Sequence, residues 1–398
     1  MSATEHAQNR QSQKAGNAAP HASVKNSESG AVHGTEGPGN ASGPAGPRPR
    51  NRRTTVFAPR LQALLDEHTG KDLVRLEPDT IGIPGAELSD RILAARRATE
   101  TERPTFKPLH GRSISKNEAA SVMRTVGRDV RAALDGPDPL PADTDLSGPW
   151  PITGHRFLRD LVLRDDPWRL RVLMSRLLEI DTKVTWTTIV TGAALPRRPR
   201  PGPHLTHLAN LVAEAETYQD RRYAMGMYRR AAAPVCFTVS TLVANALWLG
   251  SPFDDSVSDR AALYEAMRLL PPSWNLLRNR SPEYPAVDDR IGPGDDILML
   301  PLLTHRDPAL WDAPDEFRPE RWDTLDPDDT PGYLPFGHVS ERCWGRHLVM
   351  PLAELLLGHI RRTGLIVAPG QRTAEVPLLG LLGVRTVHVG HRTKVRHL

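Results

Sequence analysis

The sequence predicts an α+β fold that is mainly α-helical, with small β-sheets set into a single large helical domain. Apolar residues recur at helical spacing almost throughout residues 115–270. After Pro271 and Pro272 the pattern changes to short strand-like pieces among turns. Residues 1–54 show almost no periodic apolar pattern, so we expect two parts, a tail over 1–54 and a folded domain over 55–398.

The tail is rich in Gly, Ser, Asn, Ala and Pro, as in GTEGPGNASGPAGPRPRNRR. Such a composition cannot bury enough apolar surface to offset the entropy lost on ordering. We therefore expect residues 1–54 to be disordered.

The first folded elements follow directly. Leu61, Leu64 and Leu65 fall at helical spacing, residues 72–85 alternate and break like a pair of strands, and residues 87–97 return to a helical pattern. The helical body then predicts helices within 115–136, 155–180, 204–250 and 256–270. Strand-like pieces at 274–278 and 296–303 precede a long irregular stretch over 305–343 and a final helix over 345–362.

Composition excludes several classes of protein. Two cysteines in 398 residues cannot make a disulfide scaffold, which favours a reduced, cytoplasmic compartment. No stretch has the run of apolar residues that a membrane span needs, and the N-terminus lacks a secretory signal. The net charge of +4 is the balance of 51 basic and 47 acidic residues spread along the chain. We expect no nucleic-acid partner and no membrane partner.

One of the two cysteines, Cys343, lies in PFGHVSERCWGR just before a helix. The N–H groups and dipole of a helix start, together with the neighbouring Arg342, favour a thiolate. Thiolates in such places attack electrophiles or bind metals, whereas a cysteine taken alone is more often an inert packed residue.

This segment resembles the cysteine loop of the cytochrome P450 family, whose pattern is Phe-Gly-x-Gly-x-basic-x-Cys-x-Gly. Phe336, Gly337, Cys343 and Gly345 match in place. The resemblance implies the cytochrome P450 fold, a haem b cofactor and Cys343 as the ligand of the haem iron.

Two further motifs extend the resemblance to roughly residues 56–398. Glu265 and Arg268 match the family's Glu-x-x-Arg, and residues 317–322 match its Phe-x-Pro-Glu-Arg-aromatic motif. Residues three apart share a helix face, so Glu265 and Arg268 can meet, and Arg321 can pair with the same carboxylate. The resemblance implies that these three residues form a buried ion network that holds the cysteine loop.

Other cofactor contacts also rest on the resemblance. Arg278 stands where the family contacts a haem propionate, and RPTFKPLHGRSIS can be laid on the family's His-x-x-x-Arg helix, with Arg103 and Lys107 at the two positions. In the cysteine loop, Val339 and Glu341 replace the second glycine and the basic residue. We expect Glu341 to turn away from the propionate, and Arg342 or another cation to pair with the propionate instead.

The helix over the oxygen face of the family usually carries an acid and an alcohol that relay protons. Aligning residues 230–250 with it places Pro234 at the glycine, Cys236 at the acid, and Phe237 and Thr238 at the two threonines. Phe237 cannot donate a proton and a thiol is a poor substitute for an acid, so Thr238 and Cys236 are the catalytic candidates. Cys236 as a packed residue is the alternative.

Two weaker patterns remain. His204 and His207 could hold zinc if they shared a helix face, although no third ligand stands nearby. Trp186 and Phe237 fit the wall of a substrate pocket and fit core packing equally well.

The resemblance therefore implies an oxidoreductase acting on a small, secondary-metabolite substrate, with altered oxygen-activation residues and electrons from an external ferredoxin or flavodoxin. The alternative is a catalytically degenerate relative that acts as a partner or activator of a biosynthetic enzyme.

Overall fold

The computed structural model describes residues 53–97, 106–109, 112–135, 140–179, 182–195, 200–278, 282–338, 342–343 and 345–392. Residues 1–52, which make up nearly all of the tail predicted over 1–54, are not among the described residues. The disorder of the tail and its boundary therefore stay predictions.

The described elements are mainly helical, as predicted. The helices are α1 (Pro59–His68), α2 (Ala86–Arg97), α3 (Lys116–Leu134), α4 (Ile152–Leu163), α5 (Trp168–Leu177), α6 (Thr182–Ala194), α7 (His207–Ala213), α8 (Tyr218–Gly250), α9 (Asp259–Leu269), α10 (Tyr284–Val287), α11 (Pro301–Thr304) and α12 (Arg346–Arg362), with the 3₁₀ turn η1 (Pro319–Asp323). The helix α6 was not among those predicted from the sequence.

Four small sheets accompany the helices. The strands are β1 (Thr54–Phe57), β2 (Val74–Glu77), β3 (Thr80–Ile83), β4 (Phe106–Leu109), β5 (Arg112–Ile114), β6 (Gly148–Trp150), β7 (Leu276–Arg278), β8 (Asp296–Met299), β9 (Leu365–Val367), β10 (Thr373–Val376) and β11 (Val387–His391). Their orders are β1-β10, β6-β11-β9, β2-β3-β8-β7 and β4-β5. The predicted strand pair over 72–85 is confirmed as β2 and β3.

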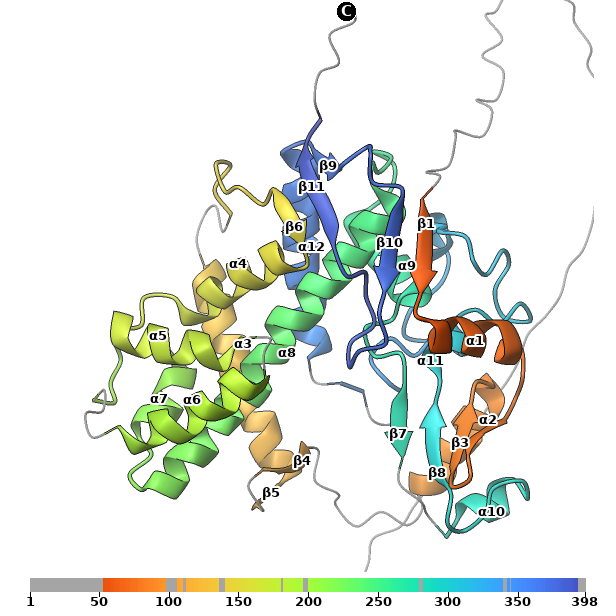
Figure 1. The fold of residues 1–398 in the computed structure, drawn as a ribbon, viewed down its shortest axis with the longest axis horizontal. Coiled ribbons are helices and arrows are strands. Elements are labelled where there is room, and N and C mark those ends of the chain that lie inside the picture. The colour runs from red at the N-terminus through yellow and green to blue at the C-terminus, as the bar shows by residue number, and fades with distance from the viewer. Residues whose placement is uncertain are drawn as a thin grey trace, which may run out of the picture. The chain divides into compact units, whose positions relative to one another are not determined.

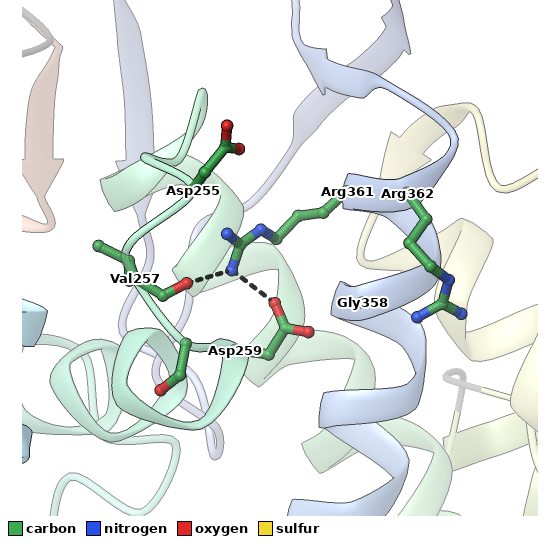
Figure 2. Close-up of a pocket in the computed structure, with 7 residues that line it drawn as sticks. Asp255, Val257, Asp259, Gly358, Arg361 and Arg362 are labelled. Carbon is green, nitrogen blue, oxygen red and sulfur yellow. Dashed lines mark hydrogen bonds and ion pairs between the residues drawn. The ribbon is translucent and has the colours of Figure 1, made fainter.

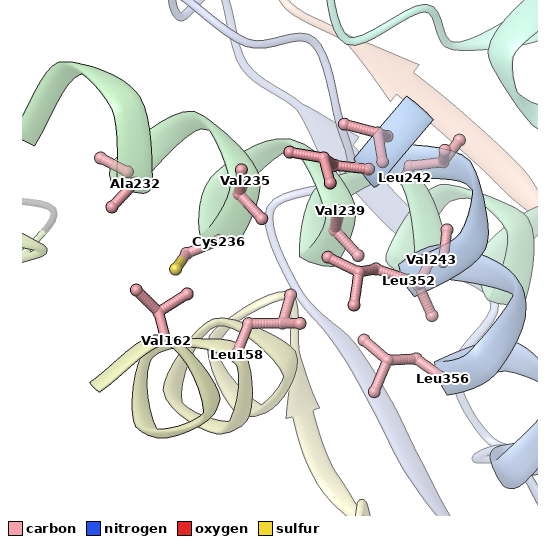
Figure 3. Close-up of a cluster of buried hydrophobic side chains, with 14 of the residues drawn as sticks. Leu158, Val162, Ala232, Val235, Cys236, Val239, Leu242, Val243, Leu352 and Leu356 are labelled. Atoms are coloured by element: carbon pink, nitrogen blue, oxygen red, sulfur yellow. The ribbon is translucent and has the colours of Figure 1, made fainter. Parts of the chain in front are cut away.

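Helix α8 is the centre of the helical body, with α4 and α12 alongside it (Figure 1). It is the one described helix long and apolar enough to cross a membrane, but 72% of its most apolar window is buried inside the protein. Its side chains join the main core with those of α4 and α12, as Figure 3 shows for Val239, Leu158 and Leu352. The apolar character of α8 is therefore explained by core packing.

The far end of α12 is tied to the start of α9. Arg361 donates hydrogen bonds to the carboxylate of Asp259 and to the carbonyl oxygen of Val257, both at 2.7 Å, beside a surface hollow (Figure 2). Gly358 allows this approach, because a Cβ atom there would lie 2.8 Å from Asp259 Oδ2. The ion pair fixes α12, whose other end follows the cysteine loop.

The β-sheets meet the helical body through tight contacts at glycines. Trp150 is fully buried and its Nε1 donates to the carbonyl oxygen of Leu146 at 3.0 Å. A Cβ atom at Gly154 would come within 2.7 Å of the ring of Trp150. We predict that Gly154→Ala lowers the free energy of unfolding by about 1–3 kcal/mol, because the ring has no room to move.

Urea unfolding followed by circular dichroism measures this effect. Gly370→Ala is the matched control, since a Cβ atom there meets nothing within 4 Å. Equal stability of the two variants would contradict the packing argument.

Candidate functional site

The cysteine loop is held by its own backbone. Gly337 has φ of 82°, a conformation that glycine adopts without strain, and Pro335 and Gly337 form an isolated β-bridge. The N–H of Cys343 donates to the carbonyl oxygen of Phe336 at 2.7 Å, which closes the loop just before α12. Val339 and Glu341, where the sequence departs from the family pattern, lie outside the described residues.

The sulfur of Cys343 is accessible, and the N–H of Gly345 points at it from 3.3 Å. Enough protein surrounds the thiol that desolvation raises its pKa, while hydrogen bonds from the backbone of Gly345 and Arg346 oppose that rise. The sequence favoured a thiolate here because of the helix start and Arg342. That expectation is wrong for the free thiol, because Arg342 pairs elsewhere and burial outweighs the backbone donors.

Arg342 is bound to Asp328. Its guanidinium lies 2.5 Å from the carboxylate and donates to the backbone oxygen of the same residue at 2.6 Å. Arg346 is 3.6 Å from that carboxylate. In this structure Asp328 is thus the partner of Arg342. The contact of Arg342 with a haem propionate stays a prediction.

A buried ion network lies behind the loop, as the sequence predicted. Arg268 donates to both carboxylate oxygens of Glu265, at 2.8 and 3.0 Å, and both side chains are completely buried. Arg321 donates to the same carboxylate from 3.2 Å. The two motifs, 56 residues apart, therefore converge on one carboxylate.

The network also holds the backbone of the irregular stretch. Arg268 donates to the carbonyl oxygens of His305, Pro314 and Glu316 at 2.6–2.9 Å. Trp322 Nε1 donates to Glu265 at 3.0 Å. A long segment without regular structure is thus fixed by one buried arginine, which explains why it can be irregular and still ordered.

His305 connects this network to the cysteine loop, a role the sequence reasoning missed. Its Nε2 accepts the N–H of Leu334 at 2.8 Å, and the carbonyl oxygen of Leu334 accepts the N–H of Gly337 at 3.2 Å. Desolvation and the neighbouring Arg268 lower the pKa of His305 to about 3, so it stays neutral and can accept. In the sequence, the only sign of this role was that His305 begins the run His-Arg-Asp-Pro at residues 305–308.

Cys236 on α8 faces α4. It is completely buried beside Leu158 and Val162 (Figure 3), and desolvation raises the pKa of its thiol to about 12. Successive helical residues are about 100° apart, so Cys236 and Thr238 lie on opposite faces. Cys236 therefore has the surroundings of a packed residue and takes no part in the chemistry proposed below.

Phe237 is turned towards α4 as well. Its ring stacks on His155 with centroids 4.3 Å apart, and the guanidinium of Arg229 lies 5.2 Å from its centroid. Pro234 and Thr238 share the remaining, more open face, since Pro234 is exposed and Thr238 half-buried. Of the four aligned positions, Thr238 alone offers a hydroxyl on that face.

One expectation about local structure is wrong. The segment aligned with the family's His-x-x-x-Arg helix forms the antiparallel strands β4 and β5, and Pro108 lies within β4, where a helix would lose an N–H donor. Arg103 and the side chain of Lys107 lie outside the described parts, so their contacts stay predictions. Arg278 is half-buried on β7 and donates to the carbonyl oxygen of Leu277 at 3.1 Å.

His204 and His207 do not share a helix face, because α7 begins only at His207 with Thr206 as its N-cap. His207 Nδ1 lies 2.6 Å from the buried carboxylate of Asp129, which also accepts two backbone N–H groups of α7. Among the described residues no group of three or more His, Cys, Asp or Glu could hold a metal ion. Trp186 lies on the outer face of α6 and not in the core.

Comparison with known proteins matches the segment that contains the three motifs. The model of the family described as cytochrome P450 matches residues 260–363, a stretch that contains all three motifs. Residues 260–363 are therefore similar to the cytochrome P450 family. Similar curated P450s include cyclooctatin synthase from Streptomyces melanosporofaciens, 36% identical over 120 residues, which are 29% of this chain and 26% of that protein. Cyclooctat-9-en-7-ol 5-monooxygenase from the same organism is 32% identical over 103 residues, which are 25% of this chain and 22% of that one.

The matches thus span about a quarter of the length of these relatives. Solved structures extend the likeness of the fold. A post-tailoring hydroxylase of himastatin biosynthesis, HmtN, and the open cytochrome P450 Eryk from S. erythraea each give a TM-score of 0.54 at 17% identity. The alignment with HmtN spans 84% of this chain and 97% of HmtN. The alignment with Eryk spans 85% of this chain and 96% of Eryk. The P450 fold predicted from the sequence is confirmed.

The ion network yields a test by charge removal. We predict that Glu265→Gln lowers the free energy of unfolding by about 3–5 kcal/mol, because it leaves buried guanidinium groups without their carboxylate. Glu354→Gln is the control, since its partner Arg260 is well exposed and the pair contributes at most about 1 kcal/mol. Urea unfolding measures both, and similar losses in the two variants would refute the network's role.

His305 yields a test by pH. Its pKa of about 3 in the folded protein lies below the ordinary 6.5, so stability is full above pH 6.5 and is lost as the pH falls towards 3. Between pH 7 and pH 5 the wild type should lose about 2 kcal/mol more than His305→Gln, whose amide keeps an acceptor for Leu334 but does not titrate. Urea unfolding at both pH values checks this, and parallel losses would contradict it.

Proposed function

We propose that this chain is a haem-thiolate monooxygenase that acts on a small organic substrate of secondary metabolism. The observation that carries the proposal is the accessible sulfur of Cys343, placed at the head of α12 by backbone hydrogen bonds. The loop that bears it is tied through Leu334 and His305 to the Glu265 network. A packed, inert cysteine needs none of this support.

The residues present fit haem b. Cys343 would hold the iron through its thiolate, and bound haem would supply the oxidising chemistry. Gly337 and Gly345 would leave room for the porphyrin, because Gly337 needs its left-handed backbone and a Cβ atom at Gly345 would lie only 3.4 Å from the sulfur. Phe336 would lie beside the cofactor.

Positive side chains would then hold the propionates. Arg278 and Arg342 are the described candidates, and Arg103 and Lys107 are those outside the described side chains. For Arg342 this role requires that a propionate replace the carboxylate of Asp328 as its partner. Arg342 would then form a salt bridge both before and after haem binds.

Proton delivery would depend on Thr238. Thr238 carries the hydroxyl on the more open face of α8. The ring of Phe237 stacks on His155, and a phenyl ring has no proton to donate. Pro234 has no N–H and cannot make the usual helical hydrogen bond to the carbonyl oxygen of Arg230. The altered positions Pro234, Cys236 and Phe237 therefore favour a reaction in which the substrate assists proton transfer.

Substrate class and partners follow from the relatives. The two Streptomyces relatives are named cyclooctatin synthase and cyclooctat-9-en-7-ol 5-monooxygenase, which supports a small organic substrate of secondary metabolism for this chain. A separate ferredoxin or flavodoxin in the cytoplasm would supply the electrons. The side of Cys343, with Arg342 and Arg346 around Asp328, is the docking face we assign to that donor.

The ferrous carbon monoxide spectrum tests the ligand. We predict that haem-loaded wild type shows the red-shifted Soret band of thiolate ligation and that Cys343→Ser abolishes it. Cys236→Ser, the matched control, should keep the band, since Cys236 is buried against α4. A band that survives in Cys343→Ser would refute the ligand, and a protein that takes up no haem would favour the alternative of a non-catalytic partner protein.

A further inference from the structure

Among the methionines that the structure describes, Met123 on α3 is the one that is not buried. The other six are each at most 7% exposed: Met174, Met225, Met227, Met267, Met299 and Met350. Met123 is half-buried, so part of its side chain is open to solvent while the rest packs against the main core. An oxidant in solution therefore reaches the thioether of Met123 before those of the buried methionines.

Helix α3 places Met123 close to the start of α12. Gly127 lies four residues later on the same face of α3, and a Cβ atom there would be 3.4 Å from Cδ2 of Leu348. Leu348 belongs to the first turn of α12, which directly follows the cysteine loop. This face of α3 is therefore packed against the part of the chain that carries Cys343.

The methyl group of Met123 and the sulfur of Cys343 border the same small space at Gly345. A Cβ atom at Gly345 would lie 3.4 Å from Sγ of Cys343, 3.9 Å from Cγ2 of Val349 and 4.0 Å from Cε of Met123. Gly345 also provides the N–H that points at the sulfur from 3.3 Å. Two apolar side chains and one backbone donor therefore lie around the sulfur.

The two cysteines compete poorly with Met123 for an oxidant. Cys236 is fully buried and burial raises the pKa of its thiol to about 12, so it keeps its proton at neutral pH, whereas the thiolate is the reactive form. Cys343 is the iron ligand under the proposed function, and its sulfur is then occupied. Met123 is the sulfur that remains open to solvent.

We propose that Met123 is a reversible oxidation site that controls ligation by Cys343, an inference that rests on the haem-thiolate function proposed above. The oxidant is hydrogen peroxide, the two-electron reduction product of dioxygen, which an oxygen-activating enzyme releases when electrons arrive without product formation. The thioether sulfur attacks one peroxide oxygen, the O–O bond breaks, and methionine sulfoxide and water form. The sulfur loses two electrons and the peroxide gains them.

Oxidation replaces an apolar group near Cys343 by a polar one. The sulfoxide oxygen is a strong hydrogen-bond acceptor, and the N–H of Gly345 lies in the same small space. An oxygen that takes this donor removes a hydrogen bond from the sulfur, and its bulk disturbs the packing of Val349. Thiolate ligation therefore weakens on oxidation of Met123 and recovers when the sulfoxide is reduced.

Peroxide treatment of the full-length, haem-loaded protein tests the proposal with two readouts other than activity. Peptide mass spectrometry follows sulfoxide formation, which should be about tenfold faster at Met123 than at the buried methionines. The ferrous carbon monoxide spectrum, scaled to haem content, should lose most of its thiolate band as Met123 oxidises. The two methionine sulfoxide reductases, one for each epimer, should restore the band, whereas destruction of haem is not reversed.

Substitutions separate oxidation of Met123 from general damage. Met123→Leu keeps the volume and cannot form a sulfoxide, so it should keep the thiolate band after the same treatment. Met123→Gln places an amide oxygen near the position of the sulfoxide oxygen and should show a reduced band without peroxide. Met350→Leu is the matched control, because Met350 is a buried methionine of α12, and it should respond like the wild type. Circular dichroism verifies that the variants are folded.

Two results would overturn this role of Met123. One is oxidation of Met123 no faster than that of the buried methionines, and the other is an equal loss of the band in wild type and Met123→Leu. Failure of the proposed function has a different signature, because the thiolate band is then missing before any peroxide is added. That result would overturn the ligand assignment and, with it, the control of ligation by Met123.

Discussion

The carboxylate of Glu265 is the interaction on which the described structure around Cys343 depends. It accepts from Arg268, Arg321, Trp322 and the backbone N–H of Arg318, and it has no exposed surface. A buried charge is tolerable only when its hydrogen-bonding capacity is filled, so each partner must be in place. The network therefore selects one arrangement of α9, the irregular stretch and η1, whether or not it adds net stability.

The influence of that carboxylate reaches the sulfur through the backbone. Arg268 binds the carbonyl oxygen of His305, the ring of His305 accepts the N–H of Leu334, and the next few residues form the turn at Gly337. Phe336 then accepts the N–H of Cys343. A neutral histidine is essential in this series, and burial beside Arg268 provides it by suppressing protonation. Desolvation keeps His305 neutral, so its Nε2 can accept the N–H of Leu334. That hydrogen bond holds the residues that lead into the cysteine loop.

On helix α8, the side of the helix on which a residue lies decides whether it can take part in proton transfer. Read along the chain, Cys236, Phe237 and Thr238 occupy three adjacent positions of the family's relay, and two of them carry a group that could take part. In three dimensions the first two face α4, where Leu158, Val162 and His155 surround them, and Thr238 remains on the other side. The phenyl ring of Phe237 stacks on the imidazole of His155 and lies near the guanidinium of Arg229, and it fills the position without restoring an acid.

The sequence by itself determined the helical body, the strand pair near residue 75 and the three motifs that resemble the cytochrome P450 family, because these depend on local periodicity and on residues at fixed spacing. The buried network of Glu265, Arg268 and Arg321, which the resemblance implied, is present in the structure. Tertiary structure alone decided the role of His305, the partner of Arg342 and the facing of Cys236, which depend on segments distant in the chain. It also decided that residues 106–109 and 112–114 pair as strands and that residues 182–194 form the helix α6, because pairing and burial override weak local preferences.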